Sequence, residues 1–320
     1  MEYKECCSIL LRQINQFIIG KEEQVEYTLT TLLAKGHLLL EDVPGVGKTT
    51  LAQVLAKSIS CDFGRIQFTP DTLPSDVTGM SVYNMKEGTF DYQKGAIMHN
   101  IVLADEINRT SPKTQASLLE AMEEKQVTVD GASHTLEQPF MVIATQNPID
   151  FLGTYHLPEA QLDRFFMRLS LGYPDVANEK IMLENMLLHK TVNKIEPVIT
   201  KQQVIGMQDE AEQVMIHSDL LNYIIKIVDA TRKNDNLALG ASPRATKALV
   251  CASQAYAYLK GREFVIPDDI QHVYHAVLCH RLVVASDARI SNTSASELLK
   301  GIVKKVPVPV MRTSEYMKKK

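Results

Sequence analysis

Short apolar runs alternate with segments of helical spacing through the first half of the chain. Because short apolar runs suit strands that are buried on both faces, we expect parallel strands near residues 37–41, 65–69, 101–104, 141–145 and 167–171. Segments between them, such as residues 51–56, repeat apolar side chains at helical spacing. The alternation predicts an α/β fold in which helices flank a five-stranded parallel sheet on both faces.

Two interruptions of this pattern predict β-hairpin insertions. Residues 81–83 and 89–92 flank one glycine-bearing turn, and residues 126–129 and 133–136 flank another. Turns with glycine occur widely on protein surfaces, so a plain surface hairpin is the alternative interpretation of each segment.

The pattern changes after residue 174. Residues 175–190 have helical spacing, residues 191–200 read as an extended connector, and helical spacing dominates from Lys201 onward. The second half is therefore predicted to be an all-α lid domain. We place an α/β domain at 1–174, the connector and lid at 175–310, and a flexible tail at 311–320.

Residues 42–50 read DVPGVGKTT between an expected strand and an expected helix. A loop that wraps a polyphosphate must aim several backbone N–H groups inward, and Gly45 and Gly47 permit the dihedral angles this requires. In such loops the lysine, here Lys48, reaches the β- and γ-phosphates, and the next hydroxyl, here Thr49, ligates Mg²⁺. The candidate nucleotide-binding residues are Pro44, Gly45, Val46, Gly47, Lys48, Thr49 and Thr50.

The loop departs from the strict phosphate-binding pattern at one position. Asp42 stands where G-x-x-x-x-G-K-[ST] begins with glycine, so we expect loop closure to rely on Pro44 and Gly45. An ordinary glycine-containing turn is the alternative. The flanking strand and helix, and an acidic partner downstream, favour the phosphate loop.

The acidic partner follows the run at 101–104, where Asp105 and Glu106 come at the end of an expected strand. Ligands of α/β sheets bind at the carboxyl ends of strands, so Asp105 is the expected magnesium carboxylate and Glu106 the expected general base that deprotonates water. A solvated strand-end carboxylate is the alternative for Glu106. Asn147 follows the next run and is the candidate residue for positioning that water, although asparagine before proline commonly starts a turn.

Composition limits the class of protein and of partner. The 320 residues are 45% hydrophobic and 22% charged, which fits a globular chain of two ordinary domains. Lysine and arginine number 34 against 38 acidic residues, and a net charge of −4 does not favour binding to nucleic acid.

Three observations lead us to expect a cytoplasmic protein. The five cysteines are an odd number without a C-x-x-C pair, which predicts reduced thiols. No apolar run approaches the roughly 20 residues of a membrane span. The start, MEYKECCSIL, lacks the basic-then-apolar pattern of a signal peptide.

His272, His275 and Cys279 share one face of an expected helix and raise the question of a metal site. We favour packing over metal binding, because structural zinc commonly takes its ligands from two elements and this helix is otherwise rich in apolar residues.

The segments LEDVPGVGKT, LADEINR, ATQNP, LPEAQLDRF and GASPRA resemble those of MoxR-type AAA+ ATPases. The match runs in order from residues 18–20 to residues 267–269. The resemblance adds Ile19 and Gly20 to the nucleotide-binding residues. It implies that Arg164 is an arginine finger donated to a neighbouring subunit and that Arg244 is a sensor contacting the γ-phosphate in its own subunit.

Each arginine also has a simpler interpretation from the sequence alone. For Arg164 this is a local ion pair with Asp163, and for Arg244 an exposed position at a helix start after Pro243.

The resemblance implies a chaperone-like, magnesium-dependent ATPase that forms a hexameric ring, with both hairpins directed toward the pore. It also implies protein clients that carry a von Willebrand factor A-type domain. A scaffold that binds ATP with negligible turnover and a nucleic-acid motor or loader are the alternatives. Glu106, Asn147 and Arg164 together argue against the scaffold, and the mild acidity of the chain argues against the motor.

Overall fold

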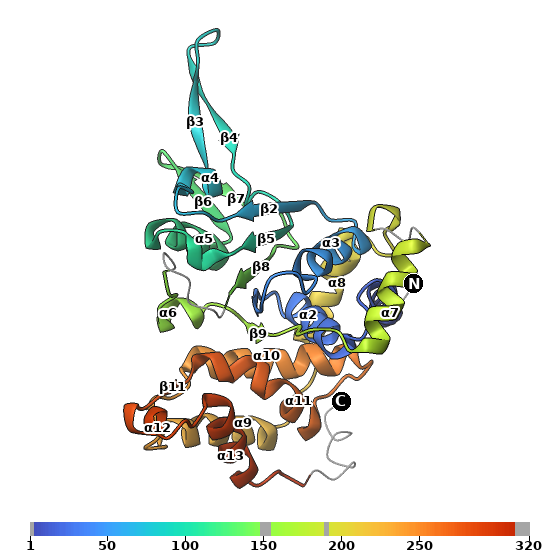
Figure 1. The fold of residues 1–320 in the computed structure, drawn as a ribbon, viewed down its shortest axis with the longest axis vertical. Coiled ribbons are helices and arrows are strands. Elements are labelled where there is room, and N and C mark those ends of the chain that lie inside the picture. The colour runs from blue at the N-terminus through green and yellow to red at the C-terminus, as the bar shows by residue number, and fades with distance from the viewer. Residues whose placement is uncertain (1–2, 148–154, 189–191, 311–320) are drawn as a thin grey trace.

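The computed structural model describes residues 3–147, 155–188 and 192–310, and its centre is one parallel sheet of five strands (Figure 1). The strand order is β2-β5-β8-β1-β9. These strands are β1 (Leu38–Glu41), β2 (Phe63–Gln67), β5 (Ile101–Asp105), β8 (Met141–Gln146) and β9 (Met167–Leu169). The predicted fold class and all five strands are therefore confirmed, although β2 begins and ends two residues earlier than the expected 65–69.

The sheet has a hydrophobic core on each face because side chains alternate along each strand. Leu38 and Leu40 of β1 belong to one cluster with the N-terminal helices and the lid, whereas Leu39 belongs to the other. The second cluster includes Leu118 and Leu119. They lie on α5, which therefore packs on the opposite face of the sheet.

The helices around the sheet begin at residues suited to that position. Ser111 accepts a hydrogen bond from the backbone N–H of Thr114, and Pro112 follows it at the first helical position of α5. The helical elements of this part are α1 (Tyr3–Asn15), α2 (Glu22–Leu33), α3 (Lys48–Ser58), α4 (Pro74–Thr78), η1 (Ile107–Arg109), α5 (Pro112–Glu124) and α6 (Glu159–Leu162).

Both predicted hairpins are present and neighbour one another. The first, β3 (Gly79–Asn84) with β4 (Thr89–Lys94), projects far from the sheet in Figure 1, and the second is β6 (Gln126–Val129) with β7 (Ala132–Thr135). Tyr92 stacks on His134 with ring centroids 3.7 Å apart, which joins the two hairpins.

Helices dominate the part of the chain that follows β9. They are α7 (Val176–Leu187), η2 (Val192–Lys194), α8 (Lys201–Glu212), α9 (Ser218–Arg232), α10 (Pro243–Leu259), α11 (Pro267–Leu278), η3 (Cys279–Arg281), α12 (Ser286–Ile290) and α13 (Ala295–Lys305). To the predicted helical lid the described structure adds a short antiparallel ladder of β10 (Leu237–Leu239) and β11 (Val283–Val284) and an isolated bridge between Met215 and Phe264. The predicted tail, 311–320, lies outside the described residues.

Helix α8 packs on α1 and α2, so the second half of the chain is joined to the first through a shared core. The domain boundary at residue 174 stays a prediction. Within the described ranges, every helix is too short or too polar to cross a bilayer.

Candidate nucleotide site and arginine edge

The phosphate loop joins β1 to α3 through two glycines in the left-handed region. Gly45 has φ 87° and Gly47 has φ 94°, and a side chain would be strained in this conformation. No atom lies within 4 Å of a Cβ built at either glycine, so the loop faces open space. Lys48 and Thr49 open helix α3, whose free N–H groups and dipole favour an anion at this end.

Asp42 fastens this loop to the chain that follows β9. Its carboxylate is 6% exposed and accepts hydrogen bonds from the Ser170 hydroxyl at 2.9 Å and from the backbone N–H groups of Leu171 and Gly172. The backbone carbonyl of Asp42 accepts from Lys48 Nζ at 2.7 Å. The expectation that closure relies on Pro44 and Gly45 was therefore incomplete, because an acidic side chain replaces glycine here and ties two segments together.

Lys48 lies within electrostatic reach of the acidic pair. Burial lowers the pKa of Lys48, and the charges of Asp42, Asp105 and Glu106 oppose that shift. These carboxylates favour the charged form of the lysine, which is the form that binds phosphate. The phosphate loop and the acidic pair therefore form one electrostatic unit.

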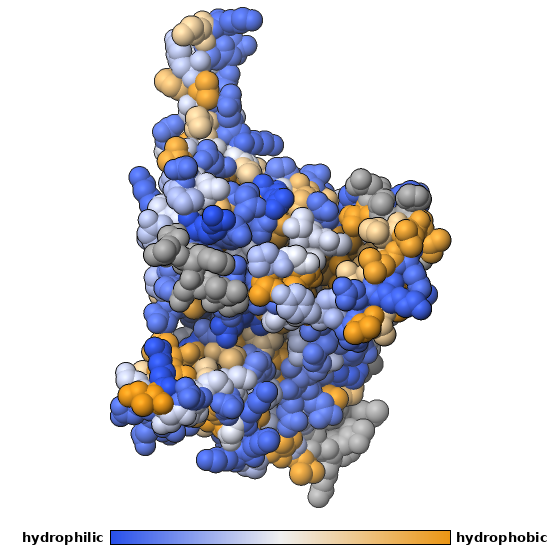
Figure 2. Space-filling model, in the orientation of Figure 1, coloured by the Kyte–Doolittle hydropathy of each residue, from blue (hydrophilic) through white to orange (hydrophobic). Residues whose placement is uncertain are grey.

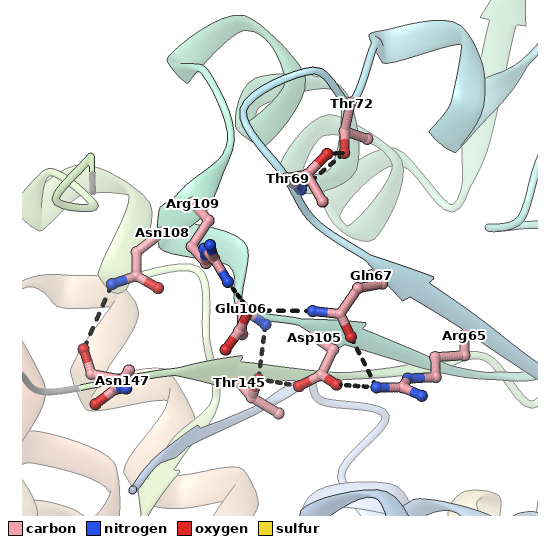
Figure 3. Close-up of polar contacts among 10 residues, drawn as sticks. All are labelled: Arg65, Gln67, Thr69, Thr72, Asp105, Glu106, Asn108, Arg109, Thr145 and Asn147. Carbon is pink, nitrogen blue, oxygen red and sulfur yellow. Dashed lines mark hydrogen bonds and ion pairs between the residues drawn. The ribbon is translucent and has the colours of Figure 1, made fainter. Parts of the chain in front are cut away.

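Asp105 ends strand β5 and is held from two sides (Figure 3). Thr145 at the end of β8 donates its hydroxyl to Oδ1 at 2.7 Å, and Arg65 of β2 pairs with Oδ2 at 2.6 Å. Its side chain is 14% exposed. Thr49 and Asp105 supply hard oxygen donors of the kind that Mg²⁺ prefers, and they could hold the ion beside the open loop.

Glu106 has an unusual backbone conformation that directs its side chain. Its φ is 59°, and its N–H donates to the Thr145 hydroxyl at 2.8 Å. Its Oε2 accepts from Gln67 at 3.1 Å and from Arg109 at 2.8 Å, as Figure 3 shows. A positive φ in a residue other than glycine is strained and frequently marks a functional position.

Asn147 follows β8 and lies near the same strand ends. Its backbone carbonyl accepts from the side chain of Asn108 at 3.4 Å, so the loops after β5 and β8 are connected (Figure 3). Its predicted role in positioning water stays a prediction.

Three supporting residues escaped the sequence analysis. Gln67 is the last residue of β2, Thr145 is the last but one of β8, and Arg65 lies in the middle of β2, all beside the acidic pair. For Gln67 and Thr145 a polar residue near a strand end was the available signal, but spacing alone did not show that they or Arg65 touch the carboxylates. We call this cluster the nucleotide edge; it consists of Lys48, Asp105, Glu106, Asn147, Arg65, Gln67 and Thr145.

A second polar cluster joins the sheet to the lid, and we call it the arginine edge. It consists of Glu123, Asp163, Arg164, Arg244 and Arg281. Arg164 Nε lies 3.3 Å from Glu123 Oε2, and Arg244 pairs with Oε1 of the same carboxylate. The simpler interpretation of Arg164 named the wrong partner: the carboxylate of Asp163 is paired with Arg281 at 2.8 Å.

Arg281 is the buried member of the arginine edge. Its side chain is 2% exposed, and it donates to the carbonyls of Phe165 at 2.6 Å and Phe166 at 3.2 Å. Burial lowers its pKa, and the charge of Asp163 opposes the shift. Ser242, the N-cap of α10, also donates to Asp163 at 3.0 Å, so this carboxylate holds the lid against the sheet.

Gly20, predicted from the resemblance to bind nucleotide, lies against helix α7. It has φ 67°, and an added Cβ would collide with the side chain of Asn178. Lys21 donates to the carbonyl of Tyr173 at 2.9 Å. Ile19, its neighbour, is partly exposed. The segment is thus positioned by the start of α7.

The three side chains considered for a metal have separate partners. His272 stacks between Tyr27 and Tyr256, with ring centroids 4.9 and 4.3 Å away. His275 is hydrogen-bonded to Ser296 at 2.8 Å, and the sulfur of Cys279 accepts from Arg168 at 3.8 Å. Among the residues described, no group of three or more His, Cys, Asp or Glu side chains is arranged to hold a metal ion.

Comparison with known proteins agrees with this architecture. A model of the ATPase family associated with various cellular activities (AAA) matches residues 37–167, and a model of the AAA lid domain matches residues 229–302. The first match covers the phosphate loop and the sheet as far as the start of β9, and the second covers α10, α11, α12 and most of α13.

Similar proteins cover nearly the whole chain. YeaC of Bacillus subtilis is 50% identical over 98% of this chain and 99% of its own length. Chaperone MoxR1 of Mycobacterium tuberculosis is 38% identical, covering 93% of this chain and 81% of its own. The crystal structure of a Cytophaga hutchinsonii protein whose name suggests an ATPase has a TM-score of 0.90 and 36% identity over 96% of each chain. On its two domains and its relatives, the chain belongs to the MoxR-type AAA+ ATPases.

Proposed function

We propose that this protein hydrolyses ATP to ADP and phosphate as one subunit of a ring, and that its nucleotide cycle remodels or activates a protein client. The observation that carries the proposal is the nucleotide edge. Lys48, Asp105 and Glu106 meet beside a loop whose two glycines face open space. The MoxR1 relative is named a chaperone, which supports a protein client.

Within this site each side chain has a separate task. Lys48 binds the phosphates, and Glu106 accepts the proton of the attacking water. Thr49 and Asp105 would hold Mg²⁺, which neutralises phosphate charge when bound. Gln67 and Arg109 orient the Glu106 carboxylate through Oε2, and a change in these two contacts would release the base toward the water.

Arg164 and Arg244 are proposed to act together on the nucleotide of a neighbouring subunit. They share the carboxylate of Glu123, so they lie on one surface. The resemblance implies that Arg244 acts within its own subunit. Its pairing beside Arg164 supports donation by both arginines to the neighbour, since the shared carboxylate of Glu123 holds the two guanidinium groups side by side.

The client is proposed to be a protein with a von Willebrand factor A-type domain, contacted by the projecting β3–β4 hairpin. Exposed apolar side chains support this role for the hairpin: Met85 is 90% and Phe90 72% exposed. Assembly of six subunits into a ring is likewise proposed from the resemblance.

Replacement of Glu106 by glutamine tests the proposed chemistry. Loss of a general base lowers turnover by about 10²–10⁴-fold, so Glu106→Gln should bind ATP and hydrolyse it very slowly. Steady-state phosphate release and binding of a fluorescent ATP analogue measure the two effects separately. The matched variant Lys48→Ala should weaken binding itself. Normal turnover by Glu106→Gln would remove the assignment, and negligible turnover by the wild-type protein would favour the nucleotide-gated scaffold.

A further inference from the structure

Arg65 and Gln67 lie next to one another on β2, an edge strand of the sheet. Because side chains alternate along a strand, the two project from the same face, and Gln67 is in register with Asp105 of β5. Both residues are exposed, and Figure 2 shows hydrophilic side chains over much of the surface where Figure 1 labels β2. The side chain of Arg65 therefore has water beside it and room to move.

One nitrogen of Arg65 connects the two acidic residues of the site through the neighbouring amide. Nη2 of Arg65 donates to Oδ2 of Asp105 at 2.6 Å and to Oε1 of Gln67 at 2.7 Å. The amide nitrogen of Gln67 donates in turn to Oε2 of Glu106 at 3.1 Å. Figure 3 shows these three hydrogen bonds as a continuous chain. The expected magnesium carboxylate and the proposed general base are thus joined through side chains.

Thr145 also joins the two acidic residues, but this second link is fixed. Its hydroxyl donates to Oδ1 of Asp105 at 2.7 Å and accepts from the backbone N–H of Glu106 at 2.8 Å. Thr145 is fully buried, whereas the side chain of Arg65 is 47% exposed and can exchange its partners for water. Of the two links, only the one through Arg65 can change without rearrangement of the sheet.

Arg65 occupies the carboxylate that the proposed chemistry assigns to Mg²⁺. Thr145 holds Oδ1 of Asp105, and Arg65 holds Oδ2. A carboxylate that binds a second cation is a weaker partner for the first, because it shares its charge between them and the two cations repel each other. We therefore expect Asp105 to hold Arg65 less firmly when it ligates a metal ion.

A looser Arg65 would change the amide of Gln67. This amide uses its oxygen for Arg65 and its nitrogen for Glu106, so the first bond fixes the orientation that the second bond needs. An amide without the guanidinium can rotate, and Oε2 of Glu106 then keeps only its partner Arg109 among these contacts. The state of Asp105 can therefore reach the proposed base.

We propose that Arg65 is a positioning residue that makes the orientation of Glu106 depend on whether Asp105 has ligated the metal. In the free protein Arg65 holds Gln67, and Gln67 holds Glu106. When Asp105 binds the ion, Arg65 leaves, the amide turns, and Glu106 is released toward the water. The inference rests on the proposed ATPase chemistry and adds to it the order in which the site becomes active.

A titration with Mg²⁺ tests this chain without hydrolysis. The signal is binding of a fluorescent, non-hydrolysable ATP analogue, and the Mg²⁺ concentration at half-maximal signal is compared between variants. Because coupling is reciprocal, a chain that the metal must loosen also opposes the metal. Arg65→Met removes the competitor for Asp105, so this concentration should fall about tenfold. Gln67→Ala removes no charge and should also lower it, because Arg65 loses one of the two acceptors that position it.

Combined substitutions show whether the residues act in series. The double variant of Arg65→Met and Gln67→Ala should behave like Arg65→Met alone, because the amide acts through the arginine. In a Glu106→Gln background Arg65→Met should lower the Mg²⁺ concentration by less, because a neutral amide accepts a weaker hydrogen bond from Gln67. Arg12→Met, at an exposed position on α1, is the matched control and should leave the concentration unchanged.

The outcomes separate this inference from the proposed function. Both β2 side chains are exposed, so the thermal unfolding midpoints of the variants should match that of the wild-type protein. A concentration that does not fall in either single variant, additive effects in the double variant, or equal effects of Arg65→Met with and without Glu106 would each overturn the inference. Binding of the analogue that is independent of Mg²⁺ in the wild-type protein would reject the metal role of Asp105 as well. Absence of phosphate release together with the expected shifts would reject only the proposed chemistry.

Discussion

The nucleotide edge and the arginine edge differ in how their charges are balanced. Around the nucleotide edge three cations, Lys48, Arg65 and Arg109, are matched by three carboxylates of the α/β part, those of Asp42, Asp105 and Glu106. At the arginine edge three arginines face two carboxylates. That edge therefore carries a surplus of positive charge, which suits an anion supplied from outside the subunit.

The difference separates a site that one subunit assembles by itself from arginines that it presents to a neighbouring subunit. Motif residues at the nucleotide edge are positioned by neighbouring strands of one sheet, so the site is assembled when that sheet folds. The arginine edge draws Arg164 from the sheet side and Arg244 from the lid, and only the docking of the two brings them to Glu123. The buried pair of Asp163 and Arg281 stabilises the contact between sheet and lid. The exposed arginines Arg164 and Arg244 can leave Glu123 and bind another anion.

The largest expected effect distinguishes the two edges by mixing variants. Arg164→Ala should lower turnover by about 10³-fold or more, because an arginine finger contributes roughly that much, and it should still bind ATP. Mixing it with Lys48→Ala should restore activity, since an intact nucleotide edge of one variant then meets an intact Arg164 of the other. ATP turnover against mixing ratio measures the rescue.

A control extends this experiment to the lid. Arg244→Ala should also be rescued by Lys48→Ala if both arginines serve the neighbour. Co-assembly must be verified by size-exclusion chromatography. A curve for either arginine that never exceeds both parents would assign that arginine to its own subunit.

The next largest effect concerns the buried pair of the arginine edge. Arg281→Met leaves Asp163 without its partner and removes donors from the carbonyls of Phe165 and Phe166. Breaking a buried ion pair costs about 3–5 kcal/mol, so the free energy of unfolding in urea should fall by that amount. Lys233→Met, which removes an exposed pair with Asp229, should cost less than about 1 kcal/mol. Equal losses in the two variants would contradict a structural role for Arg281.

Sequence patterns specified the nucleotide edge better than the arginine edge for a physical reason. Strand ends are local features, and parallel strands bring their carboxyl ends together, so Asp105 and Glu106 were predicted without knowledge of the rest of the fold. Glu123 and its partner Arg244 lie 121 residues apart in the chain, and Asp163 and its partner Arg281 lie 118 apart. Their encounter depends on how the lid docks, which no local spacing encodes.

The free energy of unfolding should fall at acid pH because two buried histidines, His37 and His280, lie next to the arginine edge. His37 is hydrogen-bonded to the carbonyl of Met122, beside Glu123, and burial lowers the pKa of His37 to about 4 from its ordinary 6.5. His280, bonded to the carbonyl of Phe165 beside Arg164, also has a pKa lowered by burial. Between pH 6.5 and pH 4 the unfolded chain binds a proton that folded His37 does not, so stability falls as the pH falls.

The magnitude follows from that window. The contribution of His37 is complete above pH 6.5 and lost by about pH 4, for a total on the order of 3 kcal/mol. His37→Gln keeps a donor and an acceptor but does not titrate, so its urea midpoint should depend less steeply on pH across this range. If the pH dependence of the urea midpoint is the same in His37→Gln and in the wild-type protein, the imidazole of His37 is not buried in its neutral form. His280 should account for part of the pH dependence that remains in the variant.

The smallest effect on stability is expected at Glu123, and it tests whether the exposed pairs are resting contacts. Its side chain is 39% exposed, and its partners Arg164 and Arg244 are 32% and 45% exposed. Pairs this accessible to water contribute about 0–1 kcal/mol each, so Glu123→Gln should change the free energy of unfolding far less than Arg281→Met does.

The same variant should keep its turnover, because both arginines remain present and are freed from a competing carboxylate. Urea unfolding and ATP turnover, measured beside Arg164→Ala, give the comparison. A loss of several kcal/mol would make Glu123 a part of the fold, as Asp163 is. A loss of turnover as large as that of Arg164→Ala would mean that Glu123 positions the arginines for catalysis. The arginine edge would then be a site assembled within one subunit, as the nucleotide edge is, and the contrast between the two would no longer hold.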